Sequence, residues 1–262
     1  MRISVSAGHN PDGKIACGAI GLIKESTEAR IVTKEVVRLL KAAGHTVHDC
    51  TVDDGTSQAN VLKKIVEKHN SYSSDLDVSI HFNSGAGDKG GNGKTTGTEV
   101  LVYSVKGGAY AYAEKIVKAI SELGFRNRGV KIRNDLYFLR KTTAPALLVE
   151  CCFVDDKDDV NLYNAKKMAQ AIVKGITGKV INADIPPATS GPSSEVKNGS
   201  FKVKVKVNAL NIRQKPDASS PVVGVIKDKG IYTITQKIGN WGYLKSKAGY
   251  INVSDLYVNR LD

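Results

Sequence analysis

The feature that most constrains the fold is a change of sequence pattern near residue 200. Before it, short apolar runs typical of strands alternate with segments whose apolar residues have helical spacing. This alternation predicts an α/β fold, with a mostly parallel twisted sheet and helices on both faces. After it, short strand-like runs follow one another between Gly, Asn, Asp and Pro, without a helical window. That pattern is typical of a small all-β barrel.

Turn residues and apolar periodicity divide the first part of the chain into elements. The first helix has Ser26 or Thr27 as its expected N-cap and Gly44 as its expected end. Because ligands bind at the carboxyl ends of strands in an open parallel sheet, those ends are where functional residues are sought. We predict strands at 2–8, 45–50, 76–83, 97–104 and 146–154, and helices at 27–45, 58–70, 108–123 and over most of 156–177.

The segment 182–200 has the composition of a linker. It holds three of the seven prolines of the chain, together with Gly, Ser and Thr, and almost no apolar periodicity. We therefore predict a first domain at 1–178, a linker at 179–199 and a second domain at 200–262.

The charge of the chain is concentrated in the second domain. The 262 residues carry a formal net charge of +12, and residues 200–262 contain 11 basic and four acidic residues, a net charge of +7. Such a surface implies a polyanionic partner: nucleic acid, an acidic membrane or an anionic cell wall. Nucleic acid is disfavoured, because no helix has a basic stripe with residues that could read bases.

The sequence indicates synthesis in a reducing cytoplasm. The N-terminus lacks the apolar segment of a secretory signal, and no apolar run approaches the roughly 20 residues that span a bilayer. The four cysteines, Cys17, Cys50, Cys151 and Cys152, show neither CxxC spacing nor the pattern of a disulfide framework. We expect no stable membrane insertion, and action outside the cell would require release by another component.

Chemically active side chains lie where the predicted strands end. His9 follows the first strand, His81 lies near the end of the third, and Glu150 lies near the end of the last. Glu28, in the first turn of the first helix, is expected near the same edge, and Glu25 is a rival to it. Two imidazoles and a carboxylate suit zinc with an open fourth position, and a second carboxylate would act there as general base.

Each candidate also has a purely structural explanation. An isolated histidine is most often a surface or hydrogen-bonded residue, and the helix dipole alone explains an acid in a first turn. Glu150 is the strongest candidate, because an unpaired carboxylate in an apolar strand is costly. His45 and His48 would point to opposite faces of a strand, and His69 is expected to be solvated. Cys17 is a weak alternative nucleophile.

Two further segments are interpreted as structural. Cys151 and Cys152 lie within a strand, where cysteines pack as small apolar side chains. The glycine-rich segment 85–97 lacks the GxxxxGK[ST] spacing of a phosphate loop. It is expected to be a mobile surface loop that borders the cleft.

Four motifs, in order along the chain, resemble one enzyme family. They are SAGHNPD at 6–12, an acid that opens the first helix at Glu28, SIHFN at 79–83 and PALLVECCFVDDKDD at 145–159. Together they resemble the zinc-dependent N-acetylmuramoyl-L-alanine amidases, and more closely the endolysins of phages that infect Gram-positive bacteria. The resemblance covers roughly residues 1–178. It implies one zinc ion per chain held by His9, Glu28 and His81, with Glu150 as the catalytic acid or base.

The same resemblance implies a substrate-binding surface near these motifs. The basic residues in GVKIRNDLYFLR precede the catalytic strand and could contact the substrate carbonyl or stem-peptide carboxylates. The alternative is a solvated basic face. The candidates are Asn83, Lys131, Arg133 and Arg140.

The second domain resembles the bacterial SH3-like cell-wall-binding domains. The resemblance rests on LNIRQKP at 210–216, on Trp241 and on the pair Gly249-Tyr250. It implies an SH3-like barrel that binds peptidoglycan, and the charge of +7 suits anionic wall polymers. Trp241, Tyr243 and Tyr250 are candidates either for ligand contact or for core packing.

The two resemblances imply a peptidoglycan hydrolase. It would cleave the amide bond between N-acetylmuramic acid and L-alanine of the stem peptide, and thereby lyse bacteria. It would act at the cell wall after release, assisted by a holin if a phage encodes it. Two alternatives stay open at this point: another zinc-dependent wall hydrolase, such as a stem-peptide peptidase, and a non-catalytic wall-binding protein.

Overall fold

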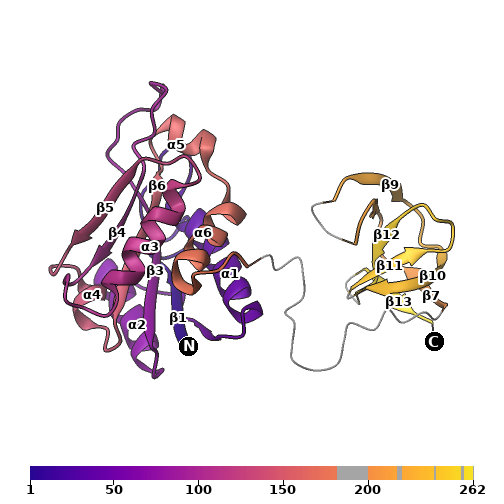
Figure 1. Ribbon diagram of the computed structural model, residues 1–262, viewed down its shortest axis with the longest axis horizontal. Helices are drawn as coiled ribbons and strands as arrows, with labels where there is room; N and C mark the ends of the chain where they lie inside the picture. The colour runs from indigo at the N-terminus through magenta and orange to yellow at the C-terminus, as the bar shows by residue number, and fades with distance from the viewer. Residues whose placement is uncertain (182–199, 217–219, 239, 255–256, 262) are drawn as a thin grey trace. The chain divides into compact units, whose positions relative to one another are not determined.

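The computed structural model of the chain describes residues 1–181, 200–216, 220–238, 240–254 and 257–261 (Figure 1). The chain divides into two compact units, Met1–Ala183 and Asp184–Asp262, and each is described by itself. The predicted linker, 179–199, lies outside the described residues except for 179–181. The domain boundaries therefore stay a prediction.

The first unit is built on a six-stranded sheet with the strand order β2-β1-β3-β6-β4-β5. β1 pairs in parallel with β2 and β3, and β3 pairs in parallel with β6. β4 is antiparallel to β6, and β5 is parallel to β4. The sheet is therefore mostly parallel, as predicted, with one antiparallel pairing between β4 and β6. Its strands are β1 (Arg2–Ala7), β2 (Thr46–Asp49), β3 (Leu76–Asn83), β4 (Thr98–Val102), β5 (Asn127–Ile132) and β6 (Ala146–Phe153).

Helices cover both faces of this sheet (Figure 1). α1, α3 and α6 pack together on one face, over a core that includes Leu40, Ile116 and Ile172. α2 and α4 lie on the other face, over a smaller cluster that includes Ile65 and Phe138. The helices are α1 (Glu25–Ala42), α2 (Gln58–Asn70), α3 (Tyr110–Ser121), α4 (Tyr137–Lys141), α5 (Lys157–Leu162) and α6 (Ala165–Thr177).

The first helix begins earlier than the sequence predicts. α1 starts at Glu25, and its N-cap is Lys24, whose side chain makes no capping hydrogen bond. Ser26 and Thr27, the expected caps, lie inside the helix. The earlier start makes Glu25 the first helical residue.

The sequence pattern also misses two elements of the first unit. β5 is an edge strand whose residues are half-buried or exposed, so it lacks the apolar pattern of a core strand. α4 has five residues, too few to show a helical period. Both fall in the segment interpreted as a basic face.

The second unit is an antiparallel all-β structure, as predicted. The described pairings of its strands are all antiparallel, in the order β13-β7-β10-β11-β12-β8-β9. Its core includes Val203, Val205, Ile234 and Ile251. The strands are β7 (Phe201–Val205), β8 (Leu210–Arg213), β9 (Val222–Ile226), β10 (Ile231–Ile238), β11 (Trp241–Leu244), β12 (Tyr250–Asn252) and β13 (Val258–Arg260).

Within the described residues, no helix combines the length and apolar character needed to cross a membrane.

Candidate metal centre

The ends of three adjacent parallel strands carry the predicted histidines and Glu150. β3 lies between β1 and β6 in the sheet. His9 lies two residues after β1, and His81 is the register partner of Glu150. Because register partners project to the same face of a sheet, His81 and Glu150 face the same cavity.

His9, Glu25 and His81 form a compact cluster at this edge. One ligand atom from each lies within 4.8 Å of the others, and no other such group of three or more occurs among the described residues. Oε1 of Glu25 lies 3.2 Å from Nε2 of His9 and 3.0 Å from Nδ1 of His81. A loop, a helix and a strand therefore each contribute one donor.

The donor set and its spacing suit zinc. Zinc bound tetrahedrally at about 2.1 Å places its ligand atoms roughly 3.4 Å apart. The two distances from Oε1 of Glu25 are close to this spacing. Three protein ligands, two of them imidazoles, are also the number found in catalytic zinc sites, which keep a fourth position for water or substrate.

Surrounding groups orient the side chains of the cluster. Oε2 of Glu25 accepts a hydrogen bond from the backbone N–H of Ala19 at 2.7 Å, and Oε1 accepts one from Phe82 at 3.3 Å. Nε2 of His81 lies 3.0 Å from Oγ of Ser79. This contact turns Nδ1 of the ring toward Glu25, which is how outer partners orient metal-binding histidines.

Gly8 allows the His81 ring to lie against the backbone. A Cβ at this position would lie 2.0 Å from Cε1 and 2.3 Å from Nε2 of the ring. Only a residue without a side chain can occupy this place. The Gly-His step after the first strand therefore positions both imidazoles of the cluster.

The electrostatics of the cluster favour the forms that bind a metal. Burial acts to raise the pKa of Glu25, but hydrogen bonds from His81 and His9 outweigh it and hold the pKa well below its usual range. Burial lowers the pKa of His81, against the opposing effect of Glu25. The ionised form of Glu25 and the neutral form of His81 are the forms that bind a metal.

The structure corrects the predicted ligand Glu28. This residue lies one turn further along α1, and its Oε2 accepts a hydrogen bond from the Tyr163 hydroxyl at 3.0 Å. The Tyr163 ring in turn packs edge-on against Phe82. Because α1 begins at Glu25, the first residue of the helix rather than the fourth reaches the histidines.

Glu150 lies beside the cluster with an unpartnered carboxylate oxygen. Its Oε2 is buried and has no hydrogen-bond partner in the described part of the chain. Burial, together with the charges of Glu25 and Glu99, raises the pKa of Glu150 to about 8, while Arg133 acts to lower it. A buried carboxyl group with a free acceptor and a pKa near neutrality has the properties of a general acid or base.

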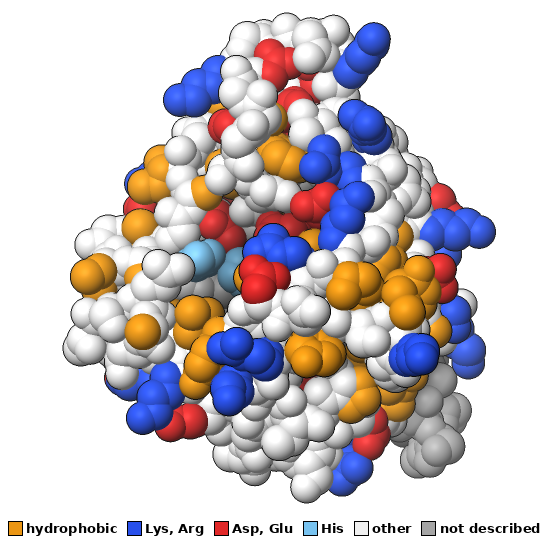
Figure 2. All heavy atoms as spheres, turned by 90° about the vertical axis from the view of Figure 1, so that its left-hand side faces the viewer, with side chains coloured by type: hydrophobic (Ala, Val, Ile, Leu, Met, Phe, Trp, Pro, Cys, Tyr) orange, Lys and Arg blue, Asp and Glu red, His pale blue; other side chains and the backbone are white. Residues whose placement is uncertain are grey.

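A cavity of about 250 Å³ adjoins the cluster and Glu150. His9 and His81 line one side, and apolar residues of α2 and α4, such as Ile65 and Phe138, line the other. Figure 2 shows histidine side chains recessed in the face of the first unit, with acidic and basic side chains around them. The cluster is therefore open to a substrate.

Of the four predicted substrate-binding residues, Arg133 lines this cavity. Asn83 is engaged elsewhere, since its side-chain amide donates a hydrogen bond to Glu99 at 2.8 Å. Lys131 and Arg140 are exposed, and Arg140 lines a separate cavity.

The structure also reveals polar residues that the sequence analysis does not single out. Ser79 and Glu99 are both buried, and a polar residue inside an apolar strand was the signal available for them. His69 is fully buried rather than solvated. Its Nε2 lies 3.0 Å from Oγ of Ser6, and its Nδ1 lies 3.0 Å from Oδ1 of Asp77.

Cys151 and Cys152 are buried, as expected for packed cysteines. Burial raises the pKa of both thiols well above its usual value. Because the thiolate is the nucleophile, neither is suited to that role.

The glycine-rich loop between β3 and β4 is held by the acidic run after β6. Asp155 accepts hydrogen bonds from three successive backbone N–H groups, those of residues 85–87. Asp158 accepts from residues 92 and 93, Asp156 from Thr96 and Asp159 from Gly97. The acids that follow Glu150 therefore hold this loop in place, and residues 85–97 are not among those that line the cavity.

The aromatic candidates of the second unit share one face of its sheet. Tyr243 on β11 is the register partner of Tyr250 on β12, and their ring centroids lie 4.7 Å apart. Trp241 lies two residues before Tyr243 on the same strand, so it projects to the same face. All three are half-buried.

Comparisons with known proteins agree on one family. The N-acetylmuramoyl-L-alanine amidase family profile matches residues 3–182. Two uncharacterized proteins of Clostridium perfringens are 36% and 37% identical, over 88% and 86% of this chain and 66% and 67% of their own length. This chain thus spans about two thirds of their length. An endolysin of Bacillus phage SPP1 is 27% identical over 81% of this chain and 76% of the endolysin.

Solved structures show the same similarity. The catalytic domain of the CD27L endolysin, described as targeting Clostridia difficile, aligns with a TM-score of 0.62 and 26% identity. The alignment covers 70% of this chain and 99% of that domain. The catalytic domain of CwlV, an amidase from Bacillus (Paenibacillus) polymyxa, aligns with a TM-score of 0.56 and 25% identity over 68% of this chain and 96% of its own.

Proposed function

The chain belongs to the N-acetylmuramoyl-L-alanine amidase family and is a peptidoglycan amidase, and on this premise we propose how its residues carry out the reaction. The substrate bond is the amide between N-acetylmuramic acid and L-alanine of the stem peptide. His9, Glu25 and His81 would hold one zinc ion, and Glu150 would act as the general base.

Each group has a distinct part in the hydrolysis. A zinc ion bound there would act as a Lewis acid and would lower the pKa of a water molecule. Glu150 accepts the proton of the attacking water through its unpartnered Oε2 and delivers it to the leaving nitrogen of L-alanine. The amide C–N bond breaks, which leaves a lactyl carboxylate and a free L-alanine amine. Arg133, at the wall of the cavity, contacts a carbonyl or carboxylate of the substrate.

The observation that carries this proposal is the proximity of a zinc-type donor set to an unpartnered carboxylate. Mass spectrometry of digested cell walls tests the bond that is cleaved. An amidase releases intact stem peptides with a free L-alanine amine, whereas a stem-peptide peptidase cuts within the stem. Products of the second kind would contradict the proposed reaction.

Metal content tests the ligand set. The wild-type chain is expected to bind one zinc ion, Glu25→Gln to lose most of it, and Glu28→Gln to retain it, because Glu28 bonds to Tyr163 instead. Zinc retained in Glu25→Gln and lost in Glu28→Gln would restore Glu28 as the ligand. A wild-type chain that hydrolyses walls without zinc would contradict the metal centre itself.

We further propose that the second unit is an SH3-like domain that binds the wall. Lys202 and Lys204 on β7, and Lys206 directly after it, are exposed and alternate with the buried Val203 and Val205. The lysines of β7 therefore project from its outer face, and Lys206 continues the alternation. A row of cations suits a linear polyanion such as an anionic wall polymer. The half-buried aromatic face of β11 and β12 is a second contact surface.

The proposed site of action is the bacterial cell wall, reached after release from the cytoplasm, with lysis as the result. The similarity to a phage endolysin supports this location.

A further inference from the structure

His9 holds an unusual backbone conformation. Its φ angle is +64°, in the left-handed region that few residues other than glycine adopt. Such a conformation persists only when neighbouring groups hold it. The groups that hold His9 therefore bear on the geometry of the metal centre.

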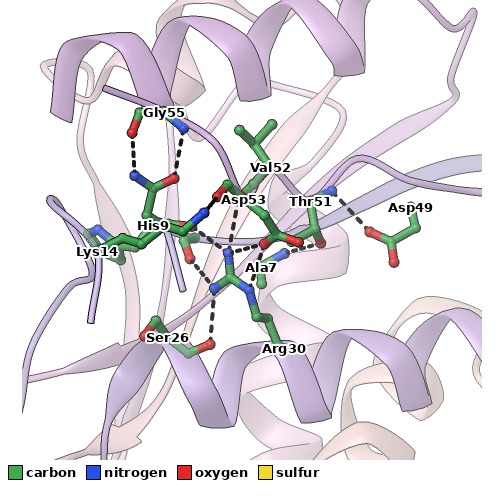
Figure 3. A network of polar contacts seen from close by, with 12 residues as sticks. Ala7, His9, Lys14, Ser26, Arg30, Asp49, Thr51, Val52, Asp53 and Gly55 are labelled. Carbon is green, nitrogen blue, oxygen red and sulfur yellow. Dashed lines mark hydrogen bonds and ion pairs between the residues drawn. The ribbon is translucent and has the colours of Figure 1, made fainter. Parts of the chain in front are cut away.

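One guanidinium, that of Arg30 on α1, meets the backbone around His9 (Figure 3). Its Nη2 donates to the carbonyl oxygens of His9 and Val52, each at 2.9 Å, and its Nη1 donates to the carbonyl oxygen of Ser26 at 3.0 Å. A longer contact of 3.5 Å reaches the carbonyl of Gly8. The side chain of Arg30 is only 15% exposed.

Asp53 completes the arrangement. Its Oδ1 accepts hydrogen bonds from Nε and Nη2 of Arg30 at 3.0 and 2.7 Å, and the Asp53 side chain is 66% exposed. The largely buried guanidinium of Arg30 thus pairs with a carboxylate at the surface, that of Asp53. Residues 52 and 53 follow β2, so the guanidinium ties that loop to the loop after β1.

The loop after β2 also forms hydrogen bonds with Asn10, the residue that follows His9. The fully buried Asn10 donates to the carbonyl of Gly55 at 2.7 Å and accepts from its N–H at 3.0 Å. Thr51 accepts from the N–H of Ala7 at 3.1 Å. The backbone of residues 7–10 is therefore held on both sides of His9.

We propose that Arg30 is a positioning residue for the metal centre, a role that rests on the proposed zinc-dependent function. Its hydrogen bonds reach no side chain of a metal ligand, and Arg30 itself is not among the residues that line the cavity. It fixes the backbone at His9 and at Ser26, the residue next to Glu25, and so sets the separation of two of the three donors. Only the forked guanidinium can reach these carbonyls together, since an ammonium is a single point.

The test compares full-length variants by zinc affinity. Arg30→Lys keeps the charge but loses the forked guanidinium. We expect zinc to bind about 10–100-fold more weakly, as is typical when a group that orients a metal ligand is lost. The visible absorption spectrum of the cobalt-substituted protein is expected to change, because the donors move. Arg38→Ala is the control: Arg38 lies on the same helix, and its guanidinium pairs with Glu35. This variant should bind zinc like the wild type.

Asp53→Asn keeps the test decisive if Arg30→Lys fails to fold. It leaves the guanidinium in place but removes its charged partner, and a smaller loss of zinc affinity in the same direction is expected. A purely structural role would lower the melting temperature of the metal-free variants and leave zinc affinity and the cobalt spectrum unchanged, which would overturn the inference. A wild-type chain that binds no zinc would instead overturn the proposed function and, with it, this inference.

Discussion

Replacing Glu150 tests its part in wall hydrolysis separately from zinc binding. Glu150→Gln keeps the size of the side chain and removes its basicity, so wall hydrolysis is expected to fall by about 10²–10⁴-fold with zinc content unchanged. The release of amine groups from purified walls, measured beside the zinc content of the same sample, checks this. Near-normal turnover in a zinc-loaded variant would place the base elsewhere, and loss of zinc would make Glu150 a ligand.

The raised pKa of Glu150 predicts how the stability of the metal-free protein depends on pH. The pKa is about 8 in the folded chain and roughly 4.3 in an unfolded one. Between these values the unfolded chain releases the proton while the folded chain keeps it. The free energy of unfolding therefore falls as the pH rises from about 4 to about 8.

Glu150→Gln removes this titration. With a chelator present, the variant is expected to melt at a higher temperature than the wild type at pH 8, and at nearly the same temperature at pH 4. Thermal melts at the two pH values measure the difference. A variant that melts lower than the wild type at pH 8 would show that the carboxyl group is not destabilised by burial.

At the residue scale, the sequence predicted the side chains that strands position. His9 and His81 follow from the rule that parallel strands end at one edge. The choice between Glu25 and Glu28 depended on the first residue of a helix. The N-cap that would mark this residue, Lys24, makes no capping hydrogen bond with its side chain. The proposed role of Arg30 could not be predicted from a sequence pattern, because it depends on carbonyl groups that three separate segments bring to the guanidinium.

At the scale of elements, the segments with strong local signals were predicted with their observed bounds. α2 matches the predicted range 58–70, and its N-cap Ser57 accepts a hydrogen bond from the N–H of Asn60. β3 matches 76–83, where apolar residues alternate with polar ones, which is the period of a strand. The direction of β4 could not be predicted, because strand pairing is set by tertiary contacts that leave no local pattern.

The loop between β3 and β4 gives an element-scale prediction. Burial acts to raise the pKa of Asp155, but the N–H groups of residues 85–87 outweigh it and lower the pKa. We expect Asp155→Ala to destabilise the chain by about 1–2 kcal/mol at neutral pH and to speed amide hydrogen exchange at residues 85–87. Asp54→Ala, which breaks an exposed ion pair with Lys64, is the control and should leave the stability nearly unchanged, because such pairs contribute little. Unchanged exchange in Asp155→Ala would show that the loop is held by other contacts.

At the scale of the whole molecule, the two units predict separable activities. We expect residues 1–180 and 200–262, expressed separately, each to melt cooperatively, since each has its own core. The smaller piece should sediment with target walls and dissociate as salt is added, because 0.1 M salt largely screens exposed charges more than roughly 10 Å apart. Failure to sediment at low salt would contradict its role in wall binding, and binding that persists at high salt would point to the aromatic face instead.

The position of β6 has a consequence for how the chain folds. This strand is the last of its sheet in the sequence, yet it lies between β3 and β4 and pairs with both. Until residues 146–153 have been synthesised, the strand that pairs with both β3 and β4 is missing. Each of the two then exposes an unpaired strand edge, which is prone to aggregation. The same insertion brings Glu150 to His81. During translation, Glu150 therefore joins the donor cluster in the step that closes the sheet, and any shorter nascent chain lacks the proposed general base.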